Sequence, residues 1–219
     1  MKTHFFRTLK LILAGAVLVC LCAGCTSEIT LELKKDGSVN VEFSGTAEKA
    51  LAALLNSASG ITGSEDSQSS VIFDTKEIEY EMGSNGFSNV KAVSKKGSDL
   101  TVTMTDKNGK SALFTSGVVS VQDKKLQAAL TPQTLVKFYK SADAQTVMFL
   151  DMLLAPIFND EKMTQEEYVE LLAAFYGEEI AEEIKNSSFR ITLKNSDGSQ
   201  TIQSIKFTKL LTLDEVLRF

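Results

Sequence analysis

Residues 29–43 read ITLELKKDGSVNVEF and decide the fold of this chain. Apolar and polar side chains alternate on both sides of a Lys-Asp-Gly-Ser turn signal at residues 35–38. A period of two places one apolar face on each strand. Strands joined by a tight turn pair antiparallel. The stretch therefore predicts a β-hairpin with one face in the core, as part of an antiparallel sheet.

The same alternation recurs along the chain. It predicts strands at residues 87–94, 100–105, 117–121, 126–130, 189–193 and 202–207. The pair Asn108-Gly109, which is typical of a type I′ turn, predicts one more strand at residues 111–115. Residues 31–38 and 191–199 look alike. Their likeness fits either an internal repeat or two ordinary hairpins.

Helix start signals are interspersed with these strands. Asp74 and Glu77 have capping-box spacing and predict a short helix to about Gly83, although Ile78 and Met82 also fit the alternation of a strand. Further helices are expected from Thr46, from Pro132, from the capping box Thr164 and Glu167, and from Thr212 to Glu215. Helices in runs, beside hairpins, predict the α+β class. We expect a mostly antiparallel sheet with helices packed on one face.

The first 25 residues have the pattern of an export signal. Three cations precede an uninterrupted apolar run, Leu11 to Leu21, and the small residues Ala23 and Gly24 stand before Cys25. The run is shorter than the roughly 20 residues that span a bilayer. We expect a signal peptide over residues 1–24 and one domain over residues 25–219. Plain secretion and a retained membrane helix are the alternatives.

Residues 21–25, LCAGC, resemble the lipobox of bacterial lipoproteins. The position three before the cysteine, usually Leu in that family, is Cys22 here, and Leu21 lies one further back. The resemblance implies lipidation of Cys25 and attachment to the membrane of a bacterial cell envelope. Each buried methylene contributes about 0.8 kcal/mol, so two or three acyl chains hold a domain essentially permanently. Thr26, where Asp would favour the inner membrane, implies the outer membrane if the cell has one.

The hairpin follows Cys25 almost at once. A tether of three residues reaches about 10 Å at most, so we expect the domain to sit close to the membrane. A lipidated cysteine followed by a strand, an Asp-Gly-Ser turn and a second strand resembles the mycobacterial LppM type of lipoprotein. That family pairs a membrane anchor with an α/β domain implicated in lipid binding. The resemblance carries over no functional residue.

Composition excludes several kinds of chemistry. The three cysteines and the single histidine, His4, all lie within residues 1–25, and the chain has no tryptophan. The mature domain therefore lacks the groups for Ser-His-Asp, Cys-His or His-metal chemistry. We expect no catalytic residue, no metal and no cofactor. The sequence accordingly predicts that the protein is not an enzyme.

The charge argues against a nucleic-acid partner. The formal net charge is −5, and removal of Lys2, Arg7 and Lys10 with the signal lowers it to −8. A nucleic-acid binder needs a basic face, but lysines cluster here only in pairs beside predicted turns. We therefore expect the membrane and a lipid or protein partner, and no nucleic acid.

The most apolar stretch of the mature chain is residues 147–158, VMFLDMLLAPIF. It is too short to span a membrane. It fits a helix buried on nearly all sides, or an apolar surface or cavity that meets acyl chains or a partner. The candidate ligand residues are Val147, Met148, Phe149, Leu150, Met152, Leu153, Leu154, Ile157 and Phe158.

Acidic residues crowd one predicted helical region, at positions 166, 167, 170, 178, 179, 182 and 183. Two carboxylates can act as acid and base on a glycoside, but this spacing is typical of a solvated helix face. Ser88 and Lys91 form a Ser-x-x-Lys on a predicted strand, where it lacks its helical context. Residues 106–109, DKNG, fit a turn better than a calcium loop.

Three functional hypotheses follow from the sequence. The first is a non-catalytic, lipid-anchored envelope protein with a binding or scaffolding surface. The second is a lipid-binding lipoprotein with an apolar cavity near residues 147–158. The third, and weakest, is a hydrolase that uses carboxylates.

Overall fold

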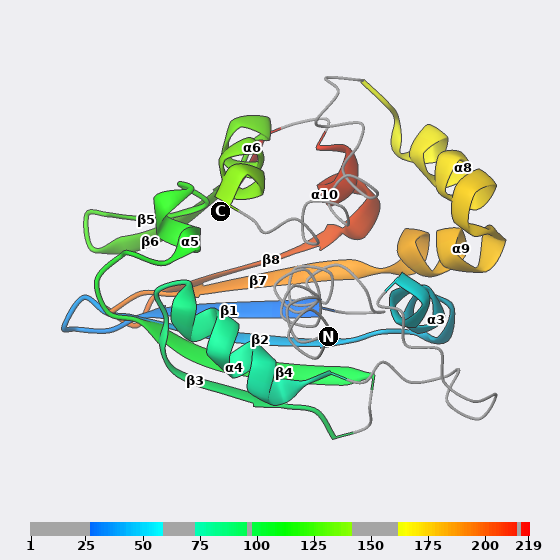
Figure 1. Ribbon diagram of the computed structural model, residues 1–219. Coiled ribbons are helices and arrows are strands. Elements are labelled where there is room, and N and C mark those ends of the chain that lie inside the picture. Colours follow the sequence, from blue (N-terminus) through cyan, green and yellow to red (C-terminus); the bar gives the residue numbers. More distant parts are fainter. Residues whose placement is uncertain (1–26, 59–72, 96–97, 142–161, 214–215) are drawn as a thin grey trace.

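The computed structural model describes residues 27–58, 73–95, 98–141, 162–213 and 216–219 (Figure 1). The residues described form a six-stranded sheet of order β3-β4-β2-β1-β7-β8, a three-stranded sheet of order β5-β6-β9, and seven helices. The predicted α+β class is confirmed. Every strand pair is antiparallel except β1 with β7.

The elements have the following bounds. The strands are β1 Ser27–Leu33, β2 Val39–Thr46, β3 Ser88–Val93, β4 Asp99–Asp106, β5 Val119–Gln122, β6 Lys125–Leu130, β7 Ser188–Lys194, β8 Gln200–Lys206 and β9 Leu217–Arg218. The helices are α3 Lys49–Ala58, α4 Thr75–Ser84, α5 Ala112–Thr115, α6 Pro132–Ser141, α8 Gln165–Tyr176, α9 Glu178–Asn186 and α10 Phe207–Thr212.

The hairpin predicted from residues 29–43 lies at the centre of the large sheet. Leu31 pairs with Val41 on β2 and with Leu193 on β7, and all three side chains are buried. These residues belong to the apolar face of the sheet, against which α4 and β6 pack through residues such as Ile78 and Leu126. The opposite face carries threonines, carboxylates and lysines. The alternation in the sequence therefore predicts which face of the large sheet is buried.

A second, smaller hydrophobic cluster joins four helices. It contains Leu51 of α3, Tyr168 and Leu172 of α8, Ile184 of α9 and Leu211 of α10. These helices gather beyond one end of the large sheet, while α4 lies across its face (Figure 1). The expectation of helices on one face therefore holds for α4, whereas the second cluster extends the core past the ends of the strands.

Two predicted elements are wrong. The strand predicted at residues 111–115 does not form: Ser111 is the N-cap and residues 112–115 form the short helix α5, because the Asp106 carboxylate gathers the N–H groups that follow it into a turn. A helix was expected from Thr212 to Glu215, but Thr212 is the last residue of α10. Leu213 adopts the left-handed conformation, with φ 44°, which ends the helix before the chain continues into β9.

The helix expected from Asp74 is confirmed over the competing strand. Asp74 Oδ1 accepts the N–H groups of Lys76 and Glu77 at 3.0 and 3.1 Å, which caps α4. Ile78 and Met82, four residues apart, face the core as a helix requires. The Thr164–Glu167 capping box is confirmed as well, and it starts α8.

Candidate functional site

The candidate residues named from the sequence lie outside the part of the chain that the structure describes. This holds for the lipidation site, Cys25, and for the apolar stretch at 147–158. Both remain predictions. Among the residues described, no helix is long and apolar enough to cross a bilayer.

The acidic helical region serves structural roles. Glu167 accepts the N–H of Thr164 at 2.8 Å, and Glu182 pairs with Lys185 at 2.8 Å. Their hydrogen bonds to Thr164 and to Lys185 hold the pKa values of both carboxyls below the usual range. A glycosidase acid needs a raised pKa. These contacts favour the interpretation as a solvated helix face over the hypothesis of a carboxylate hydrolase.

Glu183 links α9 to the start of α3. Its Oε1 accepts the N–H of Ala50 at 2.8 Å, and its Oε2 accepts the N–H of Leu51 at 2.9 Å. The first N–H groups of a helix have no partner within the helix, and a carboxylate there also meets the positive end of the helix dipole. Glu183 thus caps a helix more than 130 residues away in the sequence, a role that no local motif announces.

Removing this cap should loosen α3 without unfolding the domain. We expect Glu183→Gln to lower the free energy of unfolding by about 1 kcal/mol, as for other lost N-terminal caps. Glu179→Gln on the same helix, at an exposed position, is the matched control and should change little. Urea unfolding of the two variants measures the difference. Equal stability of both would contradict the capping role.

The polar face of the large sheet holds a shallow hollow of about 300 Å³. Thr30, Glu32, Asn40, Thr105 and Lys194 are among its lining residues. Thr105 donates its hydroxyl proton to the Asn40 amide oxygen at 3.1 Å. This surface offers a partner hydrogen-bond donors and acceptors, together with one negative charge, Glu32, and one positive charge, Lys194.

A second hollow, of about 330 Å³, lies beside β8 and the C-terminal residues. It is lined by Gln165, Lys209, the four consecutive β8 residues 203–206 and the C-terminal residues 216–219. Successive strand residues point to opposite faces, so a hollow that all four share runs along the outer edge of the strand. Neither of these hollows is the apolar cavity expected near residues 147–158.

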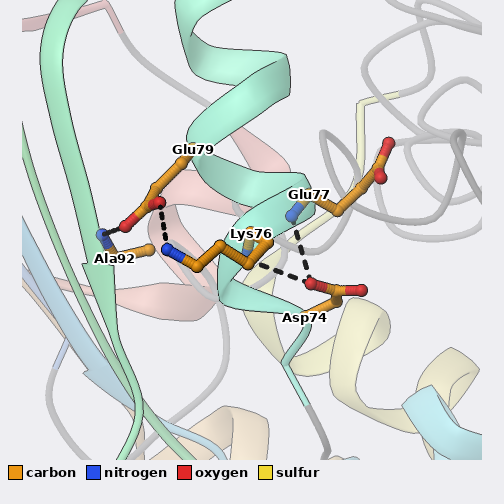
Figure 2. Close-up of polar contacts among 5 residues, drawn as sticks. All are labelled: Asp74, Lys76, Glu77, Glu79 and Ala92. Atoms are coloured by element: carbon orange, nitrogen blue, oxygen red, sulfur yellow. Dashed lines mark hydrogen bonds and ion pairs between the residues drawn. The ribbon is translucent and has the colours of Figure 1, made fainter.

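The two edges of the large sheet differ in how they are protected. At β3, Glu79 of α4 accepts the outward N–H of Ala92 at 3.1 Å and also pairs with Lys76 at 3.2 Å (Figure 2). The same strand has a register shift between Ser88 and Lys91, with Asn89 in the left-handed region. A bulge, a charged residue and a covering helix are the usual ways to close an edge. They also show that Ser88 and Lys91 belong to an edge strand and do not open a helix.

The β8 edge pairs with β7 without a register shift, and among the described residues no helix carboxylate bonds to its outer N–H groups as Glu79 does at β3. The sequence of β8, QTIQSIK, contains one charge, at its last residue, and neither proline nor glycine. Six of its seven residues are exposed, and Ile202 has 55% of its surface exposed. No described strand pairs with its outer side. Such a strand presents unpaired N–H and C=O groups to a partner, so the β8 edge is the candidate interaction site.

Hydrogen bonds at the strand ends identify the outward groups of β8. Phe207 donates to Ser187 at 3.0 Å, and Asn195 donates to Ser199 at 2.8 Å. In an antiparallel pair the bonded positions alternate. The odd-numbered residues of β8 therefore bond to β7. Gln200, Ile202 and Ser204 direct their backbone N–H and C=O groups outward. Lys206 directs its N–H outward, while its C=O accepts the first hydrogen bond of α10, because Lys206 is the N-cap of that helix.

Comparison with protein-family models, with curated proteins and with solved structures gives no match for this chain. Among the described residues, no group of three His, Cys, Asp or Glu side chains is placed to hold a metal ion.

Proposed function

We propose that the chain is a lipid-anchored protein of the bacterial cell envelope whose domain works by binding a partner and not by catalysis. The observation that carries the proposal is the sequence LCAGC at residues 21–25, which ends an apolar run and leads directly into the first strand. Exposed binding surfaces of the domain, above all the β8 edge, support the binding role.

The position of β1 couples the anchor to the centre of the domain. β1 is an inner strand between β2 and β7, and its first residue, Ser27, is 1% exposed. Ser27 follows Cys25 by two residues, which span about 7 Å at most. Acyl chains on Cys25 would therefore hold this end of the sheet at the membrane surface.

The residue content of the mature sequence supports a non-catalytic role. It contains no histidine and, apart from Cys25, no cysteine. Three of the seven carboxylates of the helical region have structural partners: Glu167 and Glu183 cap helices, and Glu182 pairs with Lys185. These carboxylates therefore stabilise the fold, and we propose that the exposed surface of the domain binds the partner.

The mature N-terminus provides the direct test. We expect the protein purified from membranes to begin at Cys25 and to carry diacylglycerol on its sulfur, because the lipoprotein route cleaves before the modified cysteine. Mass spectrometry of the N-terminal peptide measures both features. A free thiol, or a chain that retains residues 1–24, would overturn the proposal.

The lipid-binding alternative has its own readout in the same preparation. Native mass spectrometry of the protein, after mild extraction, would reveal lipid bound in addition to the covalent anchor. Reproducible retention of one lipid class would support a cavity near residues 147–158. A mass that matches the acylated chain alone would favour a protein partner.

A further inference from the structure

We propose that the β8 edge is a homodimer interface, at which β8 of one copy pairs antiparallel with β8 of a second copy. This would join two six-stranded sheets into one. The inference deepens the proposed binding function by naming the partner of one surface, and it rests on that function only in assigning the domain a binding role.

The outward backbone groups define the register. Gln200, Ile202, Ser204 and Lys206 must form the bonded pairs, and an arrangement centred on Gln203 uses all four. In it Gln200 lies opposite the second copy's Lys206, Ile202 opposite Ser204, and Gln203 opposite itself. The two pairs of Ile202 with Ser204 exchange two hydrogen bonds each, and the two pairs of Gln200 with Lys206 form one each, because the C=O of Lys206 is bonded within α10. The register therefore provides about six hydrogen bonds.

Charge favours this arrangement over a parallel one. The single charged residue of the strand, Lys206, would face the uncharged Gln200 in the antiparallel register. A parallel pairing in register would place the two copies of Lys206 together, and like charges directly opposite each other are destabilising. The hollow of about 330 Å³ beside residues 203–206 leaves space for an incoming backbone.

The contrast with β3 explains why a single edge would pair. At β3, the N–H of Ala92 is already bonded to Glu79, and the bulge at Asn89 interrupts the regular spacing of the outward groups. Pairing through β3 would require loss of the Glu79 contact. Pairing through β8 adds hydrogen bonds and breaks none that the described residues form. The association therefore closes as a dimer instead of extending into a fibre.

The twofold symmetry has a consequence at the membrane. The axis of an antiparallel β8 pair is perpendicular to the sheet, so the two copies of β1 run in opposite directions. Both Cys25 residues can then reach one membrane only if the sheet lies parallel to it. The dimer thus implies a flat orientation of the domain on the membrane.

Disulfide trapping tests the register. We would use the mature protein, purified in detergent, with Gln203→Cys. At the symmetric non-bonded position the two Cα atoms should be about 4.5 Å apart, within the range that a disulfide bridges. The matched control is Thr201→Cys, whose two copies would lie about 13 Å apart, four residues along the strand. We expect mild oxidation to cross-link the first variant into a dimer and not the second.

A charge pair tests the same register without cysteines. Ile202 and Ser204 are exposed and face each other across the predicted interface. Ile202→Lys with Ser204→Lys should weaken the dimer roughly tenfold, since two pairs of like charges would oppose each other. Ile202→Lys with Ser204→Glu should restore it. Sedimentation velocity measures the dissociation constants, and circular dichroism checks that both variants fold.

The outcomes separate this inference from the proposed function. A monomer at every concentration, with Gln203→Cys no more cross-linked than Thr201→Cys, would overturn the homodimer, as would cross-linking of β8 to another protein alone. A dimer that wild-type protein forms through a disulfide at Cys25 would count against lipidation. That result would leave the comparison of the two β8 variants unchanged.

Discussion

Replacing Cys25 with serine should abolish fatty-acid labelling and release the protein from lipoprotein processing. Serine has no thiol to accept the diacylglyceryl group, so the variant should keep residues 1–24 or be processed elsewhere. The expected change is complete, because the acyl chains supply the membrane affinity at about 0.8 kcal/mol per buried methylene. Growth with labelled palmitate, followed by immunoprecipitation and electrophoresis, measures both labelling and size.

Cys22 offers a matched control for this substitution. It lies three residues before Cys25 in the same signal, at the position where the lipobox usually has leucine. Cys22→Ser should keep the label on Cys25, with slower processing as its largest effect. Persistent labelling of the Cys25→Ser protein would show that the lipobox interpretation is wrong.

Local sequence patterns predicted the strands and helices of this fold where each pattern fits a single structure. The alternation around Leu31 and Val41 fixed both the pairing and the buried face, because a slip of one residue would turn Leu31 outward. Thr164 and Glu167 marked the start of α8 by satisfying each other's backbone donors. The strand predicted at residues 111–115 does not form because Asp106, which lies before the Asn108-Gly109 pair, controls that turn.

The candidate interaction site could not be predicted in the same way. Whether β8 is an edge strand depends on the order of strands in the sheet, which no segment encodes by itself. The low charge of residues 200–205 was the available signal, and it gains meaning only once the strand is known to lie at an edge. Likewise, the sequence around Glu79 and Glu183 predicts solvated helix residues. Only the folded structure shows that they accept the N–H groups of Ala92 and Ala50.

The two similar hairpins show how a local signal can suggest too much. Asp36 and Asp197 each accept hydrogen bonds from the serine two residues later, and Gly37 and Gly198 both have φ 85°. The turns are therefore built alike. However, β1 and β7 are parallel neighbours with the same face buried. A rotation that exchanged the two hairpins would turn the buried face outward, so the arrangement favours two similar turns over a repeat.

Asp106 organises the turn that follows β4. Its Oδ1 accepts the N–H groups of Asn108, Gly109 and Lys110 at 2.9, 2.7 and 3.3 Å, and its Oδ2 accepts that of Ser111 at 2.9 Å. Asp106 is 1% exposed, and Ser111 is fully buried. Burial alone would raise the pKa of this carboxyl, but Ser111 and the N–H groups of the turn stabilise its charge. Together they hold the pKa of Asp106 below its usual value.

Asp106→Ala should therefore lower the free energy of unfolding at pH 7 by about 2–4 kcal/mol, because it leaves the buried N–H of Ser111 without a partner and removes bonds to a charged acceptor. A carboxyl whose pKa is lower in the folded state stabilises that state above its unfolded pKa. It loses the contribution as pH falls through the folded value. The difference between wild type and variant should thus be full at pH 7 and shrink below about pH 4. Urea unfolding across pH measures it.

Two further variants separate the charge from the turn. Asp106→Asn keeps the size of the side chain and an acceptor but loses the charge, so its stability loss should be smaller and should depend less on pH. Asp36→Ala is the matched control, since Asp36 accepts hydrogen bonds from Ser38 in a solvent-exposed turn and should matter far less. Equal losses for Asp36→Ala and Asp106→Ala would contradict the role assigned to Asp106. A difference between wild type and Asp106→Ala that stays constant down to pH 2 would show that the charge of Asp106 does not contribute.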